Sequence, residues 1–309
     1  MSDAFDTPIS AATDPAGALE GPWRKPANML KAQTYDDHAS IHDDATAQKL
    51  GFRGGTIEGP THFSQLAPLL HRLWGRAWFE TGCISANYRN ASYEGEEVQA
   101  VAMPTGADTA QVSVRKRDGT VVLTGSAAVG AAADAGAVGA KLQRAQSLAT
   151  PRILAGCHVG MRAPTRQVRM DYDLRMGDLY PFSLAEKLAS ITETSPWYAR
   201  GDVAPWGRPA VPMEMISVLC QHVAADDGFP VANPVVGLFA DQEIRLIVGP
   251  LSPGNVYRLE REVIALTETP KTESMWLRSR VYLGDGLVAE MTLNQAFLKA
   301  SSPLYAGPG

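Results

Sequence analysis

The sequence contains few cysteines, and their spacing argues against two common kinds of covalent or metal scaffold. Only three cysteines occur in 309 residues, far apart at Cys83, Cys157 and Cys220. No Cys-x-x-Cys pair or Cys/His ligand spacing is present, so neither a zinc site nor a disulfide framework is expected. We expect buried, reduced thiols, as in a cytoplasmic protein.

The chain also lacks long basic or apolar runs. The formal net charge is −5 and no Lys/Arg-rich segment occurs, which argues against nucleic acid or a membrane surface as the main partner. No run of about 18 apolar residues is present, as a membrane-spanning helix requires. The N-terminus has neither the positive nor the apolar region of a signal peptide and is rich in Ala, Asp, Pro and Ser. Residues 1–19 are therefore expected to be disordered.

The apolar content that is present suffices for two globular domains. Hydrophobic residues make up 45% of the chain and charged residues 20%, which is typical of globular proteins. In the first half, we expect a short helix at 45–50, capped by Asp43 or Asp44, and a long apolar helix at 57–74. Alternating residues and turn signals predict strands at 83–90, 97–103, 111–116 and 121–129.

The second half repeats this order of elements. Residues 131–150 are rich in Ala and Gly and are expected to form a linker. The helices expected after it are 183–191 and 212–220, and the strands are 238–248, 256–266, 276–283 and 287–297. This two-copy pattern predicts an α+β protein with domains at 20–130 and 151–300 and a tail at 301–309.

A polar loop leads into the first long helix and carries the best candidates for catalysis. Asp37 and His42 lie five residues apart, and a carboxylate beside an imidazole can orient and deprotonate a water molecule. Gly59 opens the helix, where its backbone N–H and the helix dipole could stabilise a developing negative charge on oxygen. The plainer alternatives are that Asp37 caps a turn and that His42 is a core histidine.

Three neighbours of this loop are candidates for substrate binding, each with a structural alternative. Glu58 either stabilises the helix N-terminus or acts as a nucleophile or base. His62, on the first turn of the long helix, either lines a pocket or packs in the core. Arg53 either meets a phosphate of a carrier or faces solvent.

Several of these segments together resemble the MaoC-like hydratases, which have the hot-dog fold. Asp37-x4-His42 followed by an acid is similar to the ionisable positions of the family's Asp-x-Asn-Pro-x-His-x-Asp loop. The run GFRGGTIEG at 51–59 resembles the segment that enters the family's central helix. The turn YEGEEV at 93–98, and the hairpin formed by DG at 118–119 and VVLTGSA at 121–127, resemble later pieces of the same fold.

The resemblance implies a double hot-dog, in which two long helices are each wrapped by a curved antiparallel sheet. It implies an active first half and a degenerate second half, with Glu193 and Tyr198 where the family has Asp and His. The implied reaction is reversible hydration of a 2-enoyl thioester to the (R)-3-hydroxyacyl thioester, carried on coenzyme A or an acyl carrier protein, with no further cofactor. The two halves would form an internal pseudo-dimer, and pairing with a second chain stays open.

The sequence also departs from the family pattern. The family's Asn-Pro is replaced by Ala39-Ser40, and its His before the helix glycine is replaced by Glu58. The helix serine that often supports the site would fall near Ala67, so Ser64, one turn earlier, is the candidate serine for substrate binding. These changes keep open a thioesterase that uses Glu58, a non-catalytic acyl-binding protein, and a hot-dog enzyme with unusual chemistry.

Overall fold

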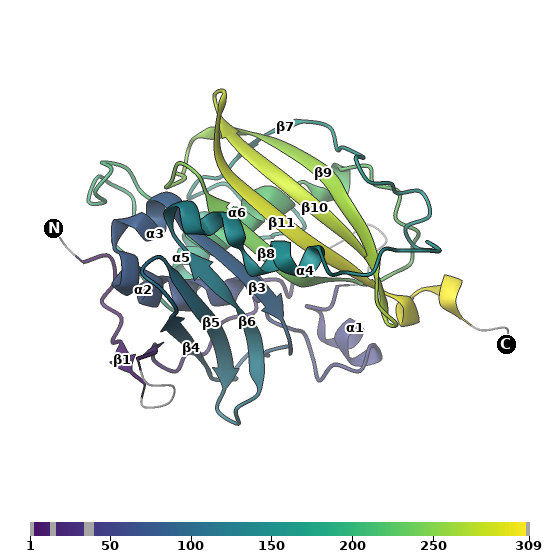
Figure 1. Cartoon of the computed structure of the whole chain (residues 1–309), viewed down its shortest axis with the longest axis horizontal. Helices are drawn as coiled ribbons and strands as arrows, with labels where there is room; N and C mark the ends of the chain where they lie inside the picture. Colours follow the sequence, from purple (N-terminus) through teal and green to yellow (C-terminus); the bar gives the residue numbers. More distant parts are fainter. Residues whose placement is uncertain (1–2, 13–16, 34–39, 307–309) are drawn as a thin grey trace.

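One antiparallel sheet runs through the molecule and joins its two halves (Figure 1). The computed structural model describes residues 3–12, 17–33 and 40–306. Within these residues the strand order is β1-β2-β4-β5-β6-β3-β8-β11-β10-β9-β7. The halves meet where β3 pairs with β8, from Cys83 opposite Arg245 to Asn87 opposite Asp241.

Every strand expected from alternation is present, with ends shifted by a few residues. These strands are β3 (Cys83–Tyr88), β4 (Val98–Pro104), β5 (Thr109–Lys116), β6 (Val121–Ala128), β8 (Gly237–Leu246), β9 (Val256–Glu268), β10 (Thr272–Leu283) and β11 (Gly286–Leu298). Three strands were not predicted, namely β1 (Ser10–Ala11), β2 (Leu19–Glu20) and β7 (Arg166–Arg169). They are too short to show an alternating pattern, and β2 and β7 pair with strands that lie far away in the chain.

The first half contains the predicted short helix and long helix. The short helix α1 (Asp44–Lys49) begins at Asp43, whose carboxylate accepts a hydrogen bond from the Thr46 N–H at 2.9 Å. The long helix starts as a 3-10 turn, η1 (Gly59–His62), and continues as α2 (Phe63–Trp74). A further helix, α3 (Arg76–Thr81), was not predicted.

The second half contains the corresponding pair of helices. Helix α5 (Leu184–Ser190) begins with a capping box formed by Ser183 and Glu186. Helix α6 (Met213–Gln221) begins after Pro212 and is buried along its whole length. The shorter 3-10 helices are η3 (Ala224–Asp226), η4 (Lys299–Ser301) and η5 (Pro303–Tyr305). No helix in the described part of the chain is long and apolar enough to cross a membrane.

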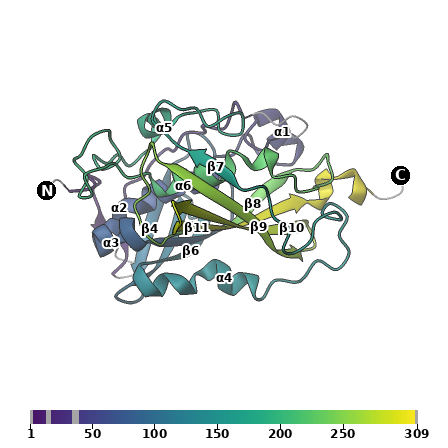
Figure 2. The same ribbon diagram turned by 90° about the horizontal axis from the view of Figure 1, so that it is seen from above.

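The expected linker is partly helical and covers the outer face of the sheet. It forms η2 (Gly130–Ala135) and α4 (Ala137–Leu142), and α4 lies on the opposite side of the sheet from α6 (Figure 2). The first N–H groups of α4 donate to hydroxyls of the sheet, from Ala137 to Ser126 at 3.3 Å and from Val138 to Ser85 at 2.9 Å. The sheet therefore supplies the caps that this helix lacks in its own sequence.

The N-terminal segment differs from the expectation that residues 1–19 are disordered. Phe5 is buried, with its ring 6.2 Å from that of Phe79 and 5.9 Å from that of Tyr198. Strand β1 pairs with β2, and β2 pairs with β4 at the edge of the sheet. The polar composition concealed this docking, because one aromatic ring and a few backbone hydrogen bonds hold the segment in place.

Candidate functional site

A cavity of about 860 Å³ brings together most of the predicted site residues. His42, Glu58, Gly59 and His62 of the first half line it. The second half contributes a largely apolar wall that includes Phe239, Met275, Leu277 and Phe297. A polar cluster and an apolar wall in one cavity are typical of sites for small molecules with an apolar portion.

The His42 imidazole is held in one tautomer. Its Nδ1 lies 2.7 Å from the Thr56 carbonyl oxygen, which can only accept, so Nδ1 carries the hydrogen and Nε2 is left with a lone pair. Burial lowers the pKa of His42 to about 4, although the bond to Thr56 opposes this shift. The ring is therefore neutral near pH 7 and able to accept a proton.

The Gly-rich turn after α1 explains how the chain places His42. The Thr56 N–H donates to the Ile41 carbonyl at 2.9 Å, and the Gly55 N–H donates to the Asp44 carboxylate at 2.7 Å. A Cβ added at Gly55 would lie 2.2 Å from the His42 carbonyl oxygen, closer than any side chain tolerates. Glycine at 55 is therefore required for the turn to close over the histidine loop.

Gly59 lies at the start of η1 and in close contact with Tyr88. A Cβ at position 59 would lie 2.4 Å from Cε1 of the Tyr88 ring. The Tyr88 hydroxyl donates to Gln242 of the second half at 2.8 Å, which fixes the ring against the glycine. Among the described residues no group accepts the Gly59 N–H, and as the first residue of a helix this donor has no partner within it.

Glu58 is buried in the cavity wall with an unsatisfied oxygen. Glu58 is only 7% exposed, and its Oε1 has no hydrogen-bond donor among the described residues. Burial raises the pKa of Glu58 to about 7, nearby Lys187 opposes the rise, and Glu214 adds to it. The carboxyl group is thus close to half-protonated at neutral pH.

Glu58 belongs to a buried ionic cluster that links the two halves. The Lys187 ammonium lies 3.2 Å from Glu214 Oε2 and 3.2 Å from the Thr61 hydroxyl. Burial raises the pKa of Glu214 as well, against the lowering effect of Lys187. Two buried carboxyl groups lie near one cation, so full ionisation of both at once is unfavourable.

His62 lines the cavity and is also fixed in the core. Its Nδ1 lies 3.1 Å from Gln65 Oε1 and its Nε2 lies 2.9 Å from the Ser92 hydroxyl. Burial lowers the pKa of His62 to about 4. With both ring nitrogens engaged, His62 contributes shape to the cavity, and both alternatives stated from the sequence hold at once.

Two predicted binding residues lie outside the cavity, and one catalytic candidate lies outside the described residues. Ser64 is buried on another face of the helix and donates to the Thr61 carbonyl at 2.7 Å, so it does not contact the cavity. Arg53 lies on the surface, 2.7 Å from Glu96 and stacked over Tyr93. Asp37 falls in the segment 34–39 that the structure does not describe, so its place beside His42 stays a prediction.

Sequence reasoning missed two residues of the second half, Lys187 and Glu214, which influence the charge of Glu58 without lining the cavity. Lys187 and Glu214 lie on helices that were predicted, but their partners became visible only in three dimensions. One signal was available, because Lys187 follows Leu184 by three residues and thus shares the apolar face of α5. A charged residue on an apolar face indicates a buried partner.

The residues at the corresponding place in the second half have structural roles. Glu193 is buried and forms an ion pair with Arg24 at 2.6 Å. Tyr198 packs against Phe5 and Phe79. Neither lines the cavity.

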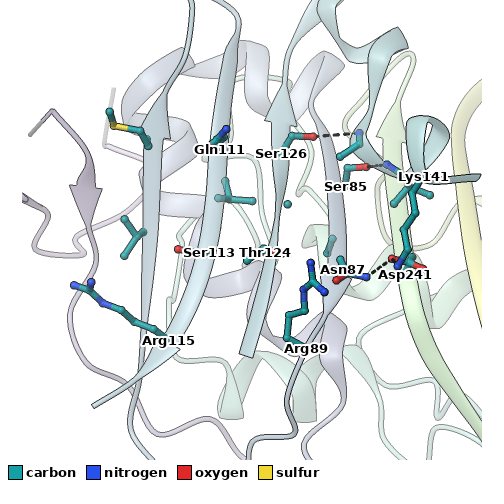
Figure 3. A pocket seen from close by; sticks show the side chains of 17 residues that line it. Ser85, Asn87, Arg89, Gln111, Ser113, Arg115, Thr124, Ser126, Lys141 and Asp241 are labelled. Carbon is teal, nitrogen blue, oxygen red and sulfur yellow. Dashed lines mark hydrogen bonds and ion pairs between the residues drawn. The ribbon is translucent and has the colours of Figure 1, made fainter. Parts of the chain in front are cut away.

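A second hollow of about 660 Å³ lies on the outer face of the sheet beside α4 (Figure 3). Its lining mixes apolar side chains with hydroxyl and amide groups, and it includes the Asp241 carboxylate and three basic residues, Arg89, Arg115 and Lys141. Asp241 is fully buried and accepts from Lys141 at 2.6 Å and from Asn294 at 2.8 Å, while Arg115 pairs with Glu20 at 2.6 Å. The charges of Asp241, Lys141 and Arg115 are paired within the protein, and none of the predicted site residues that the structure describes lines this hollow, so we place the chemistry in the larger cavity.

Comparison with known proteins identifies the fold. No protein-family model matches the sequence, and no curated protein matches it. A conserved hypothetical protein from Mycobacterium tuberculosis, described as a double hot-dog, superposes with a TM-score of 0.57 at 13% identity over 96% of this chain and 97% of that chain. A MaoC domain protein from Chloroflexus aurantiacus gives 0.53 at 12% identity over 96% and 95%, and a MaoC-like dehydratase gives 0.51 at 15% identity over 90% and 96%.

The chain therefore has the double hot-dog fold, and the resemblance to MaoC-like proteins extends from the sequence motifs to the structure. At these identities the similarity establishes the fold. The reaction must be argued from the residues of the cavity.

Proposed function

We propose that this protein is a hydro-lyase that adds water reversibly to the double bond of a 2-enoyl thioester and forms a 3-hydroxyacyl thioester. The observation that supports it best is His42, which presents a neutral Nε2 base in a cavity that also contains a helix-start glycine and an apolar wall. Fold-level analogy with MaoC-like dehydratases supports the same class of reaction.

In the proposed reaction, His42 acts as the base that activates water. As the water oxygen bonds to C3, its proton passes to Nε2 of His42, and the electrons of the C2–C3 double bond move toward the thioester carbonyl. The His42 imidazolium then gives this proton to the enolate-like carbon C2, so that H and OH are added across the double bond and the neutral base is restored. Asp37, on the same loop, would hold the water on its other side.

The N–H of Gly59 would receive the thioester oxygen as it gains negative charge. It stands at the head of η1 and α2, where the backbone N–H groups and the helix dipole favour an anion. The close contact of Gly59 with Tyr88 would keep this donor in place during the reaction. The acyl chain would occupy the apolar part of the cavity, and coenzyme A or an acyl carrier protein would carry it in a cytoplasmic setting.

One observation favours a second candidate, a thioesterase that uses Glu58. The unsatisfied Oε1 of this buried carboxyl group lies in the wall of the same cavity. In that reaction the carboxylate would activate water, or attack directly, at the thioester carbonyl carbon, and a free thiol would leave. Hydration forms no free thiol, so the two reactions differ in a product that is simple to measure.

The test uses crotonyl-CoA and a longer 2-enoyl-CoA with the purified protein. Loss of the enoyl absorbance and release of free thiol are followed in parallel. We expect absorbance to fall without thiol release, and His42→Ala to lower kcat by about 10²–10⁴-fold. His158→Ala, which changes an exposed histidine outside the cavity, is the matched control and should keep full activity.

Thiol release that depends on Glu58 would replace the hydratase with the thioesterase. Binding of both thioesters with no change in either signal would point to the non-catalytic acyl-binding protein. Full activity of His42→Ala would remove His42 from its proposed role.

A further inference from the structure

The C-terminal end of α6 brings a group of polar residues to the cavity that the proposed reaction does not use. Gln221, His222 and Asp227 line the cavity together with the apolar residues of the second half. A plain hydrocarbon chain would gain nothing from polar groups at this position. Their arrangement therefore bears on which acyl groups the cavity accepts.

The orientation of the Gln221 amide is determined by Arg261. Gln221 Oε1 accepts a hydrogen bond from Arg261 Nη2 at 3.2 Å. A guanidinium group can only donate, so the amide oxygen must face Arg261 and the amide nitrogen must point away. Gln221 is 4% exposed, and among the described residues nothing accepts a hydrogen bond from its Nε2.

Arg261 is itself held in place by a buried ion pair. Its Nη1 contacts the Asp227 carboxylate, and both side chains are buried. Gln221 is therefore not free to turn toward another acceptor. A buried amide N–H₂ without an acceptor is costly, so an incoming oxygen atom would relieve that cost.

His222, the next residue of the cavity lining, offers a complementary group. Its Nδ1 lies 3.2 Å from the Val218 carbonyl oxygen and 3.1 Å from the Leu219 carbonyl oxygen. Both partners accept, so Nδ1 carries the hydrogen and Nε2 has a lone pair. Gln221 and His222 thus present one donor and one acceptor from adjacent positions of the chain.

A chain of contacts along α6 separates this pair from the proposed reaction centre. Tyr88, which touches Gly59, donates to Gln242, and Gln242 in turn donates to Ser217 of α6 at 2.8 Å. Gln221 follows Ser217 by four residues, which is about 6 Å along the helix axis. Gln221 and His222 line the cavity together with the apolar residues of the second half, so we place the pair on the side of the cavity where the acyl chain would extend.

We propose that Gln221 and His222 form a subsite for a hydroxyl group on the distal part of the acyl chain. The hydroxyl oxygen accepts from Gln221 Nε2, and the hydroxyl hydrogen is donated to His222 Nε2. A carbonyl oxygen would satisfy Gln221 alone and should bind less well. The preferred substrates are then hydroxylated acyl thioesters, an assignment that rests on the proposed function for the carrier and the position of the thioester.

The test measures binding with thioesters that lack the reactive double bond. Hexanoyl-, octanoyl- and decanoyl-CoA are compared with their terminally hydroxylated counterparts by isothermal titration calorimetry. We expect the hydroxylated thioester to bind about tenfold more tightly than the plain one at the chain length that reaches the subsite. Gln221→Met should remove this preference.

Two controls keep the test decisive. His222→Leu, made separately, should also reduce the preference, so the result does not depend on the fold of one variant, and circular dichroism checks both. Equal binding of plain and hydroxylated thioesters at every length would overturn the subsite, because Gln221 would then be satisfied by water only. A preference in a protein that hydrates no 2-enoyl-CoA would uphold the subsite and overturn the proposed reaction.

Discussion

Individual residues of the cavity owe their chemistry to burial. Burial lowers the pKa of His42 to about 4 and raises that of Glu58 to about 7, because the charged form of each group loses its hydration. The same cause thus produces a neutral histidine and a carboxyl group that retains a proton. Near neutral pH, His42 can therefore accept a proton, and Glu58 can either accept or donate one.

The pH dependence of kcat/KM separates the two candidate reactions. If neutral His42 is the base, activity appears as the pH rises through about 4 and is level from about pH 5 upward. If the Glu58 carboxylate is the base, activity rises through about pH 7 as the proton leaves. We expect the first profile for hydration, with Glu58→Gln leaving its shape unchanged. A rise centred near pH 7 that Glu58→Gln abolishes would contradict this.

Substitution of Gly59 tests the contact that positions the proposed oxyanion donor. A Cβ at this position would lie 2.4 Å from Tyr88 Cε1, so Gly59→Ala must displace the ring or the start of η1. We expect kcat to fall by about 10²-fold or more if the donor moves. The matched control is Gly139→Ala inside α4, where an added Cβ meets nothing, and it should stabilise the protein by about 0.4–1 kcal/mol. Unchanged turnover in Gly59→Ala would show that the N–H is not used.

At the scale of elements, three helices meet at one buried cation. Lys187 comes from α5, Glu214 from α6 and Thr61 from η1. Each helix is specified locally, by a capping box in α5 and by prolines at the start of the other two. Their packing against one another is specified by the Lys187 ammonium, which comes from α5 and contacts residues of the other two helices.

Removal of Lys187 should leave two buried acids without a counter-ion. We expect Lys187→Met to lower the free energy of unfolding by about 3–5 kcal/mol at neutral pH, measured by urea denaturation. The loss should shrink below the raised pKa values of Glu58 and Glu214, because both carboxyl groups then become neutral. Lys31→Met, which removes an exposed pair with Glu94, should cost less than about 1 kcal/mol. Similar losses in both variants would mean that the buried cluster stabilises the protein no more than an exposed ion pair does.

At the scale of the whole molecule, the halves are joined in two places, along the sheet and through the N-terminal segment. One is the pairing of β3 with β8, which makes a single sheet (Figure 1). The other is the N-terminal segment, where Phe5 packs against Phe79 of the first half and Tyr198 of the second. The cavity is lined from both halves, so its shape depends on both of these contacts between the halves.

Loss of the Phe5 ring should weaken the contact of the N-terminal segment with both halves. We expect Phe5→Ala to lower the free energy of unfolding by about 3–5 kcal/mol in a urea titration, because it leaves a void among aromatic rings. Leu304→Ala, which truncates an exposed side chain near the other terminus, should change it by less than about 0.5 kcal/mol. A small effect of Phe5→Ala would restore the sequence-based expectation that this segment contributes little.

The sequence by itself determined the longer strands, the main helices and the order in which they occur. Hydrophobic periodicity and turn signals are local, so 83–90 and 212–220 could be assigned as strand and helix from neighbouring residues alone. The spacing of His42 and Gly59 likewise reflects one loop and one helix start. These features depend on interactions within about a dozen residues.

Only the tertiary structure decided which residues surround the cavity and what their charges are. Lys187, Glu214 and Gln242 reach Thr61, Ser64 and Tyr88 across more than a hundred positions of sequence. Ser64, expected in the site, faces another helix, and Phe5, expected to be disordered, closes a gap between the halves. Burial sets these pKa values and contacts, and burial is a property of the packed molecule that no local pattern contains.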